Sequence, residues 1–292
     1  MKSRIVLFIT AACGLLSTAS ITLAQSTSAV ERGRALVNGV AACGNCHTPL
    51  DTSNRPVTER ELAGGRLFKD DAFTAYAANL TPDPDTGLGR WSDAQIGKAI
   101  REGVRPDGSI IGPPMAVDAY RGLADDDLQA IIAYLRSIPP VKNAVAKSDY
   151  KPGVVPASYG PPVGKIVAPS KLDLVRYGEY LAGPVGHCME CHSPRGANRH
   201  PDYANRLGAG GNSFHGPWTV SVSRNLTPHE SGLKNWTDAE VARAIREGID
   251  RHGNRLKPPM GFGFYRNMAE DEMAAIIAYL RSLKAMPFAG GS

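Results

Sequence analysis

The sequence predicts an all-α protein made of two tandem copies of one helical domain. First, motifs recur at a constant spacing: Ala130–Ser137 returns with the same eight letters as Ala275–Ser282, 145 residues later. Second, each copy carries matching helix-start and helix-stop signals. Third, neither copy shows the apolar–polar alternation that is typical of strands. A repeat of this length indicates that a whole domain was duplicated.

The first 24 residues predict an export signal. Lys2 and Arg4 precede the apolar run Ile5–Leu16, and Thr22–Ala24 is a small-residue cleavage site. An uncleaved anchor is the alternative, because the charge-free run of 20 residues that starts at Ile5 could span a membrane. Serine and threonine dilute that run, so we expect cleavage.

Each domain is expected to be a set of short helices. A leading helix is predicted over Val30–Ala41 in domain 1 (residues 25–138) and over Leu174–Leu181 in domain 2 (residues 172–292). Capping boxes at Ser92–Gln95 and Thr237–Glu240 start a second helix. The last helix of domain 1 has acidic residues, Asp125–Asp127, at its favourable N-terminal end, and an apolar stripe follows in both copies.

Residues 139–171 form a linker that contains seven prolines. Proline cannot continue a helix, so this segment should be extended. We expect it to run over the surface of both domains and to fix their relative position.

Two segments, Cys43–His47 and Cys188–His192, have the pattern C-x-x-C-H, which is the attachment signature of c-type haem. Two thiols on one helical turn can add to the two vinyl groups of a porphyrin, and the adjacent imidazole can then ligate the iron. The sequence therefore predicts two covalently bound haem c groups. The predicted attachment residues are Cys43, Cys46, His47, Cys188, Cys191 and His192.

Other interpretations of these cysteines stand beside this one. Four cysteines remain once Cys13 leaves with the export signal, a number that could indicate a disulfide framework. A zinc site could pair the two C-x-x-C units, but it would not explain a histidine after both. A thioredoxin-like redox pair would need a βαβ context, which the sequence does not show.

The second axial ligands are predicted to be Met115 and Met260. Each lies 68 residues after the histidine of its own copy, in a Pro-Pro-Met segment where the prolines stiffen the loop. The alternative is a core methionine, the commoner role of this residue. The predicted iron ligands are thus His47, Met115, His192 and Met260.

Other residues that recur in both copies could support a haem. The carbonyl of Pro49 or Pro194 could accept a hydrogen bond from the ligating imidazole. For the tryptophan and arginine pairs, contact with the macrocycle or its propionates stands beside ordinary packing or a solvated surface role, and the asparagines are expected to stabilise a turn. These pairs are Trp91 and Trp236, Arg101 and Arg246, and Asn79 and Asn225.

The charge of the chain gives no indication of a nucleic-acid partner. The formal net charge is +5, and removal of residues 1–24 leaves 31 basic and 28 acidic residues. Neither a basic stripe nor a charge run is present, so we predict no binding to nucleic acid.

The order of these motifs resembles the cytochrome c subunits of bacterial periplasmic alcohol, gluconate and aldehyde-type dehydrogenases. The resemblance implies class I cytochrome c domains with His/Met haems in a periplasmic protein. It also implies a periplasmic dehydrogenase catalytic subunit as the electron donor, and a quinone or respiratory-chain acceptor in or at the inner membrane. The alcohol and gluconate subunits have three such modules and a membrane-binding tail, whereas this chain has two modules.

The expected function is a relay of single electrons without catalysis by the chain itself. Any association with the membrane would then come through a partner. One alternative is a dihaem enzyme, such as a thiosulfate dehydrogenase or a peroxidase, and another is a free electron shuttle without a dedicated partner.

Overall fold

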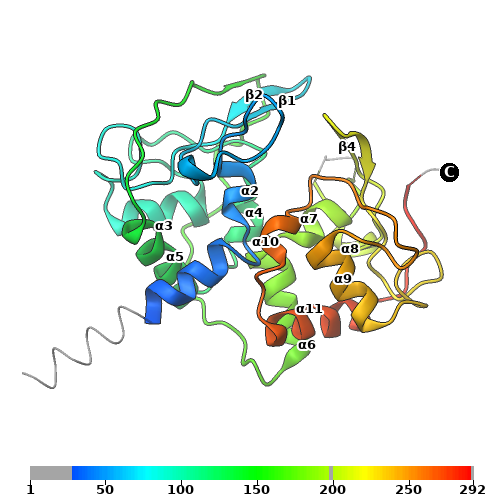
Figure 1. The fold of residues 1–292 in the computed structure, drawn as a ribbon. Coiled ribbons are helices and arrows are strands. Elements are labelled where there is room, and N and C mark those ends of the chain that lie inside the picture. The colour runs from blue at the N-terminus through cyan, green and yellow to red at the C-terminus, as the bar shows by residue number, and fades with distance from the viewer. Residues whose placement is uncertain (1–27, 197–199, 291–292) are drawn as a thin grey trace, which may run out of the picture.

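The computed structural model describes residues 28–196 and 200–290, which form two lobes side by side (Figure 1). The predicted export signal, residues 1–24, lies outside the described residues. Within the described residues, no helix has both the length and the apolar character needed to cross a membrane.

In each lobe a leading helix crosses the last helix at very short range. Residues 28–37 cross α5 (Asp125–Ser137), and α6 (Leu174–Tyr180) crosses α11 (Glu270–Ser282). A Cβ atom on Gly33 would lie 1.9 Å from the carbonyl oxygen of Ala130, and the equivalent Cβ on Gly178 would lie 1.8 Å from that of Ala275. Glycine is therefore required at both crossings.

The predicted capping boxes are confirmed. The Ser92 hydroxyl accepts a hydrogen bond from the backbone N–H of Gln95 at the start of α3 (Asp93–Glu102), and Thr237 does the same at the start of α9 (Asp238–Glu247). Both helices end at a glycine in the left-handed region, with φ 67°, where a residue without Cβ carries no steric cost.

The all-α prediction is wrong, because the described residues contain five short strands in two sheets. In the first lobe, β1 (Leu67–Lys69) pairs antiparallel with β2 (Phe73–Tyr76), and β2 pairs with β3 (Asp149–Tyr150). In the second lobe, β4 (Ser213–Gly216) pairs with β5 (Thr219–Val222). Most of these residues are at least partly exposed on both faces. A sheet without a fully buried face needs no alternation of apolar and polar residues, so the sequence gives no period-2 signal.

The proline-rich linker packs mainly on the first lobe. Its residues 149–150 form β3, and the hydroxyl groups of Tyr150 and Tyr159 donate to the carbonyl oxygens of Pro113 and Ile111 at 3.0 and 2.8 Å. It reaches the second lobe at Lys171, whose ammonium group lies 3.1 Å from the Asp271 carboxylate.

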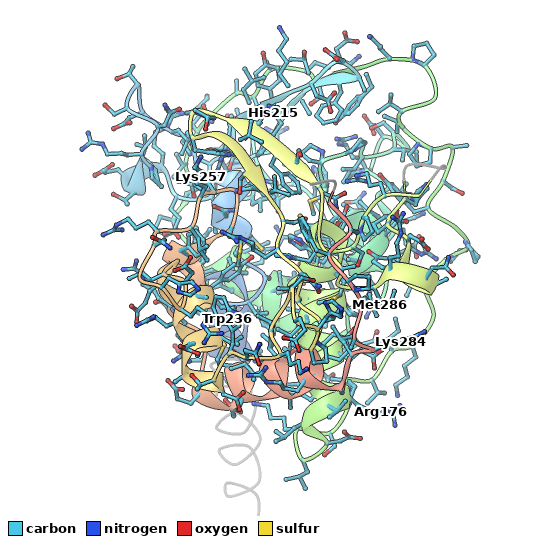
Figure 2. All side chains as sticks on the ribbon, turned by 90° about the vertical axis from the view of Figure 1, so that its right-hand side faces the viewer. Arg176, His215, Trp236, Lys257, Lys284 and Met286 are labelled. Carbon is cyan, nitrogen blue, oxygen red and sulfur yellow. The ribbon has the colours of Figure 1, made fainter. Side chains whose placement is uncertain are left out.

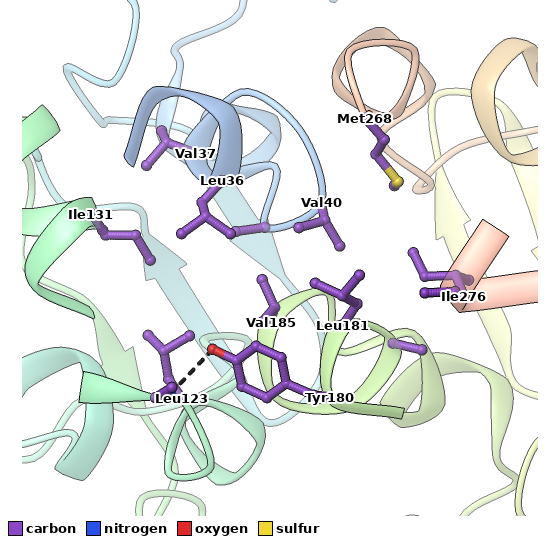
Figure 3. Close-up of a cluster of buried hydrophobic side chains, with 14 of the residues drawn as sticks. Leu36, Val37, Val40, Leu123, Ile131, Tyr180, Leu181, Val185, Met268 and Ile276 are labelled. Atoms are coloured by element: carbon purple, nitrogen blue, oxygen red, sulfur yellow. Dashed lines mark hydrogen bonds between the residues drawn. The ribbon is translucent and has the colours of Figure 1, made fainter. Parts of the chain in front are cut away.

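One hydrophobic core runs through both lobes (Figure 3). Leu36 and Val40, from the first lobe, face Leu181 and Val185, from the second, and all four side chains are almost fully buried. The lobes are thus packed on each other rather than connected only by the linker. The remaining elements are α2 (Cys43–His47), η1 (Thr58–Arg60), α4 (Val117–Tyr120), the π-helical segment η2 (Leu181–Val185), α7 (Cys188–His192), α8 (Tyr203–Arg206) and α10 (Phe262–Tyr265).

Candidate functional site

Both C-x-x-C-H segments form a short helix of their own, α2 and α7. Each helix is preceded by a residue in the left-handed region, Ala42 with φ 48° and His187 with φ 41°. The structure places the two cysteines and the histidine of each segment on little more than one helical turn, the arrangement that the attachment chemistry needs.

The two imidazoles are oriented in the same way. The Nδ1–H of His47 donates to the carbonyl oxygen of Ala78 at 2.8 Å, and that of His192 donates to the carbonyl oxygen of Arg224 at 2.7 Å. A carbonyl oxygen can only accept, so Nδ1 carries the proton and Nε2 is left as a free lone pair for a metal. Burial lowers the pKa of both histidines, although the bond to the carbonyl opposes this. Both rings are therefore neutral, as a ligand must be.

The acceptor of these bonds differs from the one proposed from the sequence. The carbonyl groups of Pro49 and Pro194 accept from the backbone N–H of Val57 and Asp202 instead. Ala78 comes from a loop 31 residues further along the chain, so proximity in sequence was misleading.

Glycines with positive φ bring this loop close to the histidine. The N–H of Gly64 donates to the carbonyl oxygen of His47 at 2.7 Å, and Gly210 does the same for His192. Gly64 has φ 74°, and a Cβ there would lie 2.5 Å from the carbonyl carbon of Ala78. The loop can therefore approach the imidazole only with glycine at this position.

No disulfide joins the four cysteines of the two attachment segments. Burial around the sulfur atoms raises the pKa of Cys43 and Cys191 to about 12 and that of Cys188 to about 11, and it also raises the pKa of Cys46. A reactive redox dithiol needs a lowered pKa, so these thiols do not fit the redox alternative. Partly buried cysteines beside an oriented imidazole do fit a covalently held porphyrin.

The zinc alternative has no matching arrangement among residues 28–196 and 200–290. No three His, Cys, Asp or Glu side chains come together there as a group that could hold a metal ion.

Met115 and Met260 hold equivalent places in the two lobes. Each is partly buried and stands just ahead of a short helix, α4 or α10. The preceding Pro-Pro bond is cis in both copies. The structure thus gives the two methionines the same local backbone, and their role as iron ligands stays a prediction.

The paired arginines bind acidic residues of the last helix. Arg101 forms an ion pair with Asp125, and Arg246 forms one with Glu270 at 2.5 Å. In both, Nε is buried without a partner among the described residues. The alternative of solvated helix arginines does not hold for Arg101, whose side chain is only 10% exposed.

The tryptophans and asparagines have packing and turn roles. Trp91 and Trp236 are partly buried against the hydrophobic core. The Asn79 side chain accepts from the backbone N–H of Thr81 at 2.9 Å and donates to the carbonyl oxygen of Val141 at 2.8 Å. Asn225 makes the equivalent pair of bonds. The expected turn role of the asparagines is confirmed, and each also ties its loop to the segment after the last helix.

Two further residues support the attachment helices and were not found from the sequence. Arg66 donates to the backbone carbonyl of Asn45 in α2, and Asn212 donates to that of Cys191 in α7 at 2.8 Å. Because different residue types make these bonds in the two copies, the repeat gives no signal for them.

The interface between the lobes brings the two attachment regions close to each other. The Asn45 side chain in α2 donates to the carbonyl oxygen of Pro259 at 3.0 Å, beside Met260 of the other lobe. The rings of Tyr120 and His187 pack edge-to-face across the interface, with centroids 5.7 Å apart. Burial raises the pKa of Tyr120 well above its usual value, and the thiols of Cys43 and Cys46 add to this.

Each of the two helices carries a pair of partly buried cysteines and an oriented neutral imidazole. This arrangement defines a protein of the covalent-haem class. Similarity to known proteins agrees with this. The cytochrome c family profile matches residues 30–139 and 180–284, so the chain belongs to the cytochrome c family. It is an electron-transfer cytochrome with covalently bound haem c.

Three relatives illustrate the range of this similarity. The chain is 30% identical to the fructose dehydrogenase cytochrome subunit of Gluconobacter japonicus, over 86% of this chain and 52% of the relative. It is 29% identical to a nicotinate dehydrogenase subunit of Pseudomonas putida, over 90% of this chain and 22% of that relative. It is 28% identical to a diheme c-type cytochrome of Cereibacter sphaeroides, over 84% of this chain and 82% of that relative. The chain thus spans only about a fifth to a half of the two dehydrogenase subunits.

Proposed function

We propose that the chain carries two haem c groups and relays single electrons from a periplasmic dehydrogenase catalytic subunit to a quinone or respiratory-chain acceptor in or at the inner membrane. One haem would be held by Cys43, Cys46, His47 and Met115, and the other by Cys188, Cys191, His192 and Met260. The observation that carries this proposal is that both lobes present the same buried, neutral, Nδ1-anchored imidazole. When bound, each haem supplies one-electron oxidation and reduction at its iron.

The residues around each proposed iron favour rapid electron transfer, because they keep the surroundings of the iron fixed. The carbonyl groups of Ala78 and Arg224 hold the imidazole planes in place, so that the ligand need not reorient when the charge changes. Burial keeps water away from both histidines, which are 9% and 7% exposed. Methionine ligation would raise the potential and leave no open coordination position for a substrate.

The donor and acceptor are proposed from the relatives. The fructose and nicotinate dehydrogenase proteins are named as parts of dehydrogenases, which supports a catalytic subunit as donor. We propose a periplasmic location on the export signal, residues 1–24, and expect any membrane association to come through that partner.

The first test measures haem content and ligation in the purified holoprotein. We expect two covalent haems per chain and a thioether-to-iron charge-transfer band from each oxidised haem. Met260→His should lower one of the two potentials and remove half of that band, and Met115→His should do the same for the other haem. Met286→Leu is the control, since this methionine lies in the C-terminal tail (Figure 2) and should leave the band and both potentials unchanged. A full band in Met260→His would refute the ligand assignment.

The second test separates a relay from an enzyme. The holoprotein should be reduced rapidly by its donor dehydrogenase and should copurify with it from native membranes. Turnover of peroxide or thiosulfate by the pure holoprotein would instead identify a dihaem enzyme. Equal rates with unrelated donors would identify a free shuttle.

A further inference from the structure

A single arginine stands between two carboxylates where the lobes meet. Arg32 Nε donates to Asp127 Oδ1 at 2.8 Å, and Nη1 donates to Glu272 Oε1 at 2.5 Å. The two acidic side chains are only 10% and 3% exposed. Asp127 lies on α5 of the first lobe and Glu272 on α11 of the second. Arg32 therefore joins the last helices of the two lobes.

The repeat shows that this arrangement is built from equivalent positions. Asp127 and Glu272 are 145 residues apart and so hold the same place in the two copies, and the counterpart of Arg32 is Tyr177. The Tyr177 hydroxyl accepts from Arg32 Nη2 at 3.3 Å. Equivalent surfaces thus face each other, as at a two-fold interface. Only one of the two copies supplies the cation that such a pair of buried acids requires.

A second bond between the lobes ends on the same carboxylate. The Tyr180 hydroxyl, on α6 of the second lobe, donates to Asp127 Oδ2 at 2.7 Å. It also accepts from the backbone N–H of Ala124 at 3.2 Å, just ahead of α5 (Figure 3). The Tyr180 side chain is buried, so this network lies inside the interface and is not a surface ion pair.

The arrangement of the lobes in turn sets the separation of the attachment sites. Across the same interface, Asn45 of α2 contacts Pro259 beside Met260, and Tyr120 packs on His187 beside Cys188. Any rotation of one lobe on the other would break these contacts and move α2 relative to α7.

We propose that Arg32 is a positioning residue for electron exchange between the two haems, because it holds the lobes in one arrangement by bridging Asp127 and Glu272. The inference rests on the proposed function. In that exchange one iron would lose a single electron and the other would gain it, with no bond or proton transferred. Arg32 acts on this step only through distance. Without it, two buried carboxylates would face each other with no cation between them, which strongly disfavours the closed interface.

The test uses the full-length holoprotein with Arg32→Met, which keeps much of the apolar stem and removes the charge. Spin labels at Ala94→Cys and Ala239→Cys, which are exposed and equivalent positions on α3 and α9, report the distance between the lobes. Flash reduction of one haem reports the exchange rate. Arg176→Met is the matched control, because Arg176 is exposed on α6 and lies at the edge of the molecule (Figure 2).

We expect one narrow distance distribution in the parent and in Arg176→Met, a longer and broader one in Arg32→Met, and electron exchange several-fold slower in Arg32→Met alone. The triple variant Arg32→Met/Asp127→Leu/Glu272→Leu should restore the narrow distribution, because an apolar replacement of a buried ion cluster can keep an interface closed. An unchanged distance and rate in Arg32→Met would overturn the proposal.

Two further measurements keep the test decisive. If Arg32→Met does not fold, Arg32→Lys takes its place. The lysine ammonium cannot match the planar fork that spans both acids, so it should broaden the distribution partly, and parent behaviour would again overturn the proposal. Haem content is measured first in every variant. A parent with fewer than two haems would refute the proposed function, whereas two haems with an unchanged distance would refute only the role of Arg32.

Discussion

The tight crossing of the leading and last helices leads to a quantitative prediction for Gly33→Ala. The added Cβ would lie 1.9 Å from the carbonyl oxygen of Ala130, 2.6 Å from its carbonyl carbon and 2.8 Å from the Cβ of Tyr134. The nearest atoms belong to the backbone of α5, so no side chain can rotate to relieve the overlap. The helices themselves must separate.

The size of the effect follows from this overlap. An ordinary contact begins at 3.4 Å, so the pair must move apart by about 1.5 Å, the difference between that limit and 1.9 Å. Overpacking typically costs about 1–3 kcal/mol, and a rigid backbone clash belongs at the upper end. Alanine regains about 1 kcal/mol in helix propensity. The net loss should therefore be about 2 kcal/mol, which is roughly a 30-fold fall in the folding equilibrium constant.

The assay is denaturant unfolding of the holoprotein, followed by the helix signal. Gly178→Ala, the equivalent change in the second lobe, should cost a similar amount, since its Cβ would lie 1.8 Å from the carbonyl oxygen of Ala275. Gly263→Ala is the control. This glycine lies in α10 with nothing within 4 Å of a Cβ, so it should be neutral or slightly stabilising. If Gly33→Ala were as stable as Gly263→Ala, the close crossing of the helices would be refuted.

Three further predictions concern one helix cap and two loop residues. Ser92→Ala removes the hydroxyl that caps α3 and should cost about 1 kcal/mol in urea unfolding, whereas an unchanged midpoint would contradict the cap. Asn225→Ala leaves the buried N–H of Thr227 without its acceptor and should cost about 1–3 kcal/mol by the same measurement. The Thr86 hydroxyl and N–H hold the pKa of Asp83 below its usual range. This carboxylate therefore stabilises the fold above its unfolded pKa of about 3.9, and the contribution is lost as the pH falls through the lower folded value. Asp83→Asn should accordingly be less stable than the parent at pH 7, by a margin that shrinks below about pH 4, and a margin independent of pH would refute this role.

The repeat and the motifs were sufficient to predict the family and the leading, capped and last helices of each copy, but not the short helices between them. The capping boxes at Ser92 and Thr237, and the glycine stops that follow, depend only on neighbours within a few residues, so local sequence specifies them. The C-x-x-C-H segments are equally local. The sheets escaped prediction because partly exposed strands carry no alternation. The pairing of β2 with β3 also joins segments far apart in the chain.

The contacts around the imidazoles could not be predicted from local sequence either. A carbonyl two residues from the histidine was the natural candidate in sequence, yet the acceptor is Ala78, brought near by the positive φ of Gly64. The counterpart residues in the second lobe, Gly210 and Arg224, do the same. The two copies share such glycines, but only the structure shows which carbonyl group they bring close to the imidazole.

Positions where the two copies differ indicate contacts that the shared motifs do not predict. Arg32 and Tyr177 differ because they meet at the interface between the lobes. Gly112 and Lys257 differ for a related reason. A Cβ on Gly112 would lie 2.6 Å from the ring of Tyr150 in β3, whereas in the second lobe Lys257 donates to Thr219 Oγ1 and to the carbonyl oxygen of Val220 (Figure 2).

In the second lobe, Lys257 contacts β5, which is the counterpart of β2, the strand that pairs with β3 in the first lobe. Residues that the two copies share, such as His47 and His192 with Gly64 and Gly210, form the same contacts in each lobe. Some residues that differ, such as Arg32 and Tyr177, make contacts between the lobes, whereas others, such as Lys257, make contacts within one lobe. In a duplicated chain of this kind, a charged helix residue with an uncharged aromatic counterpart, as at position 32, is thus a candidate contact between the lobes.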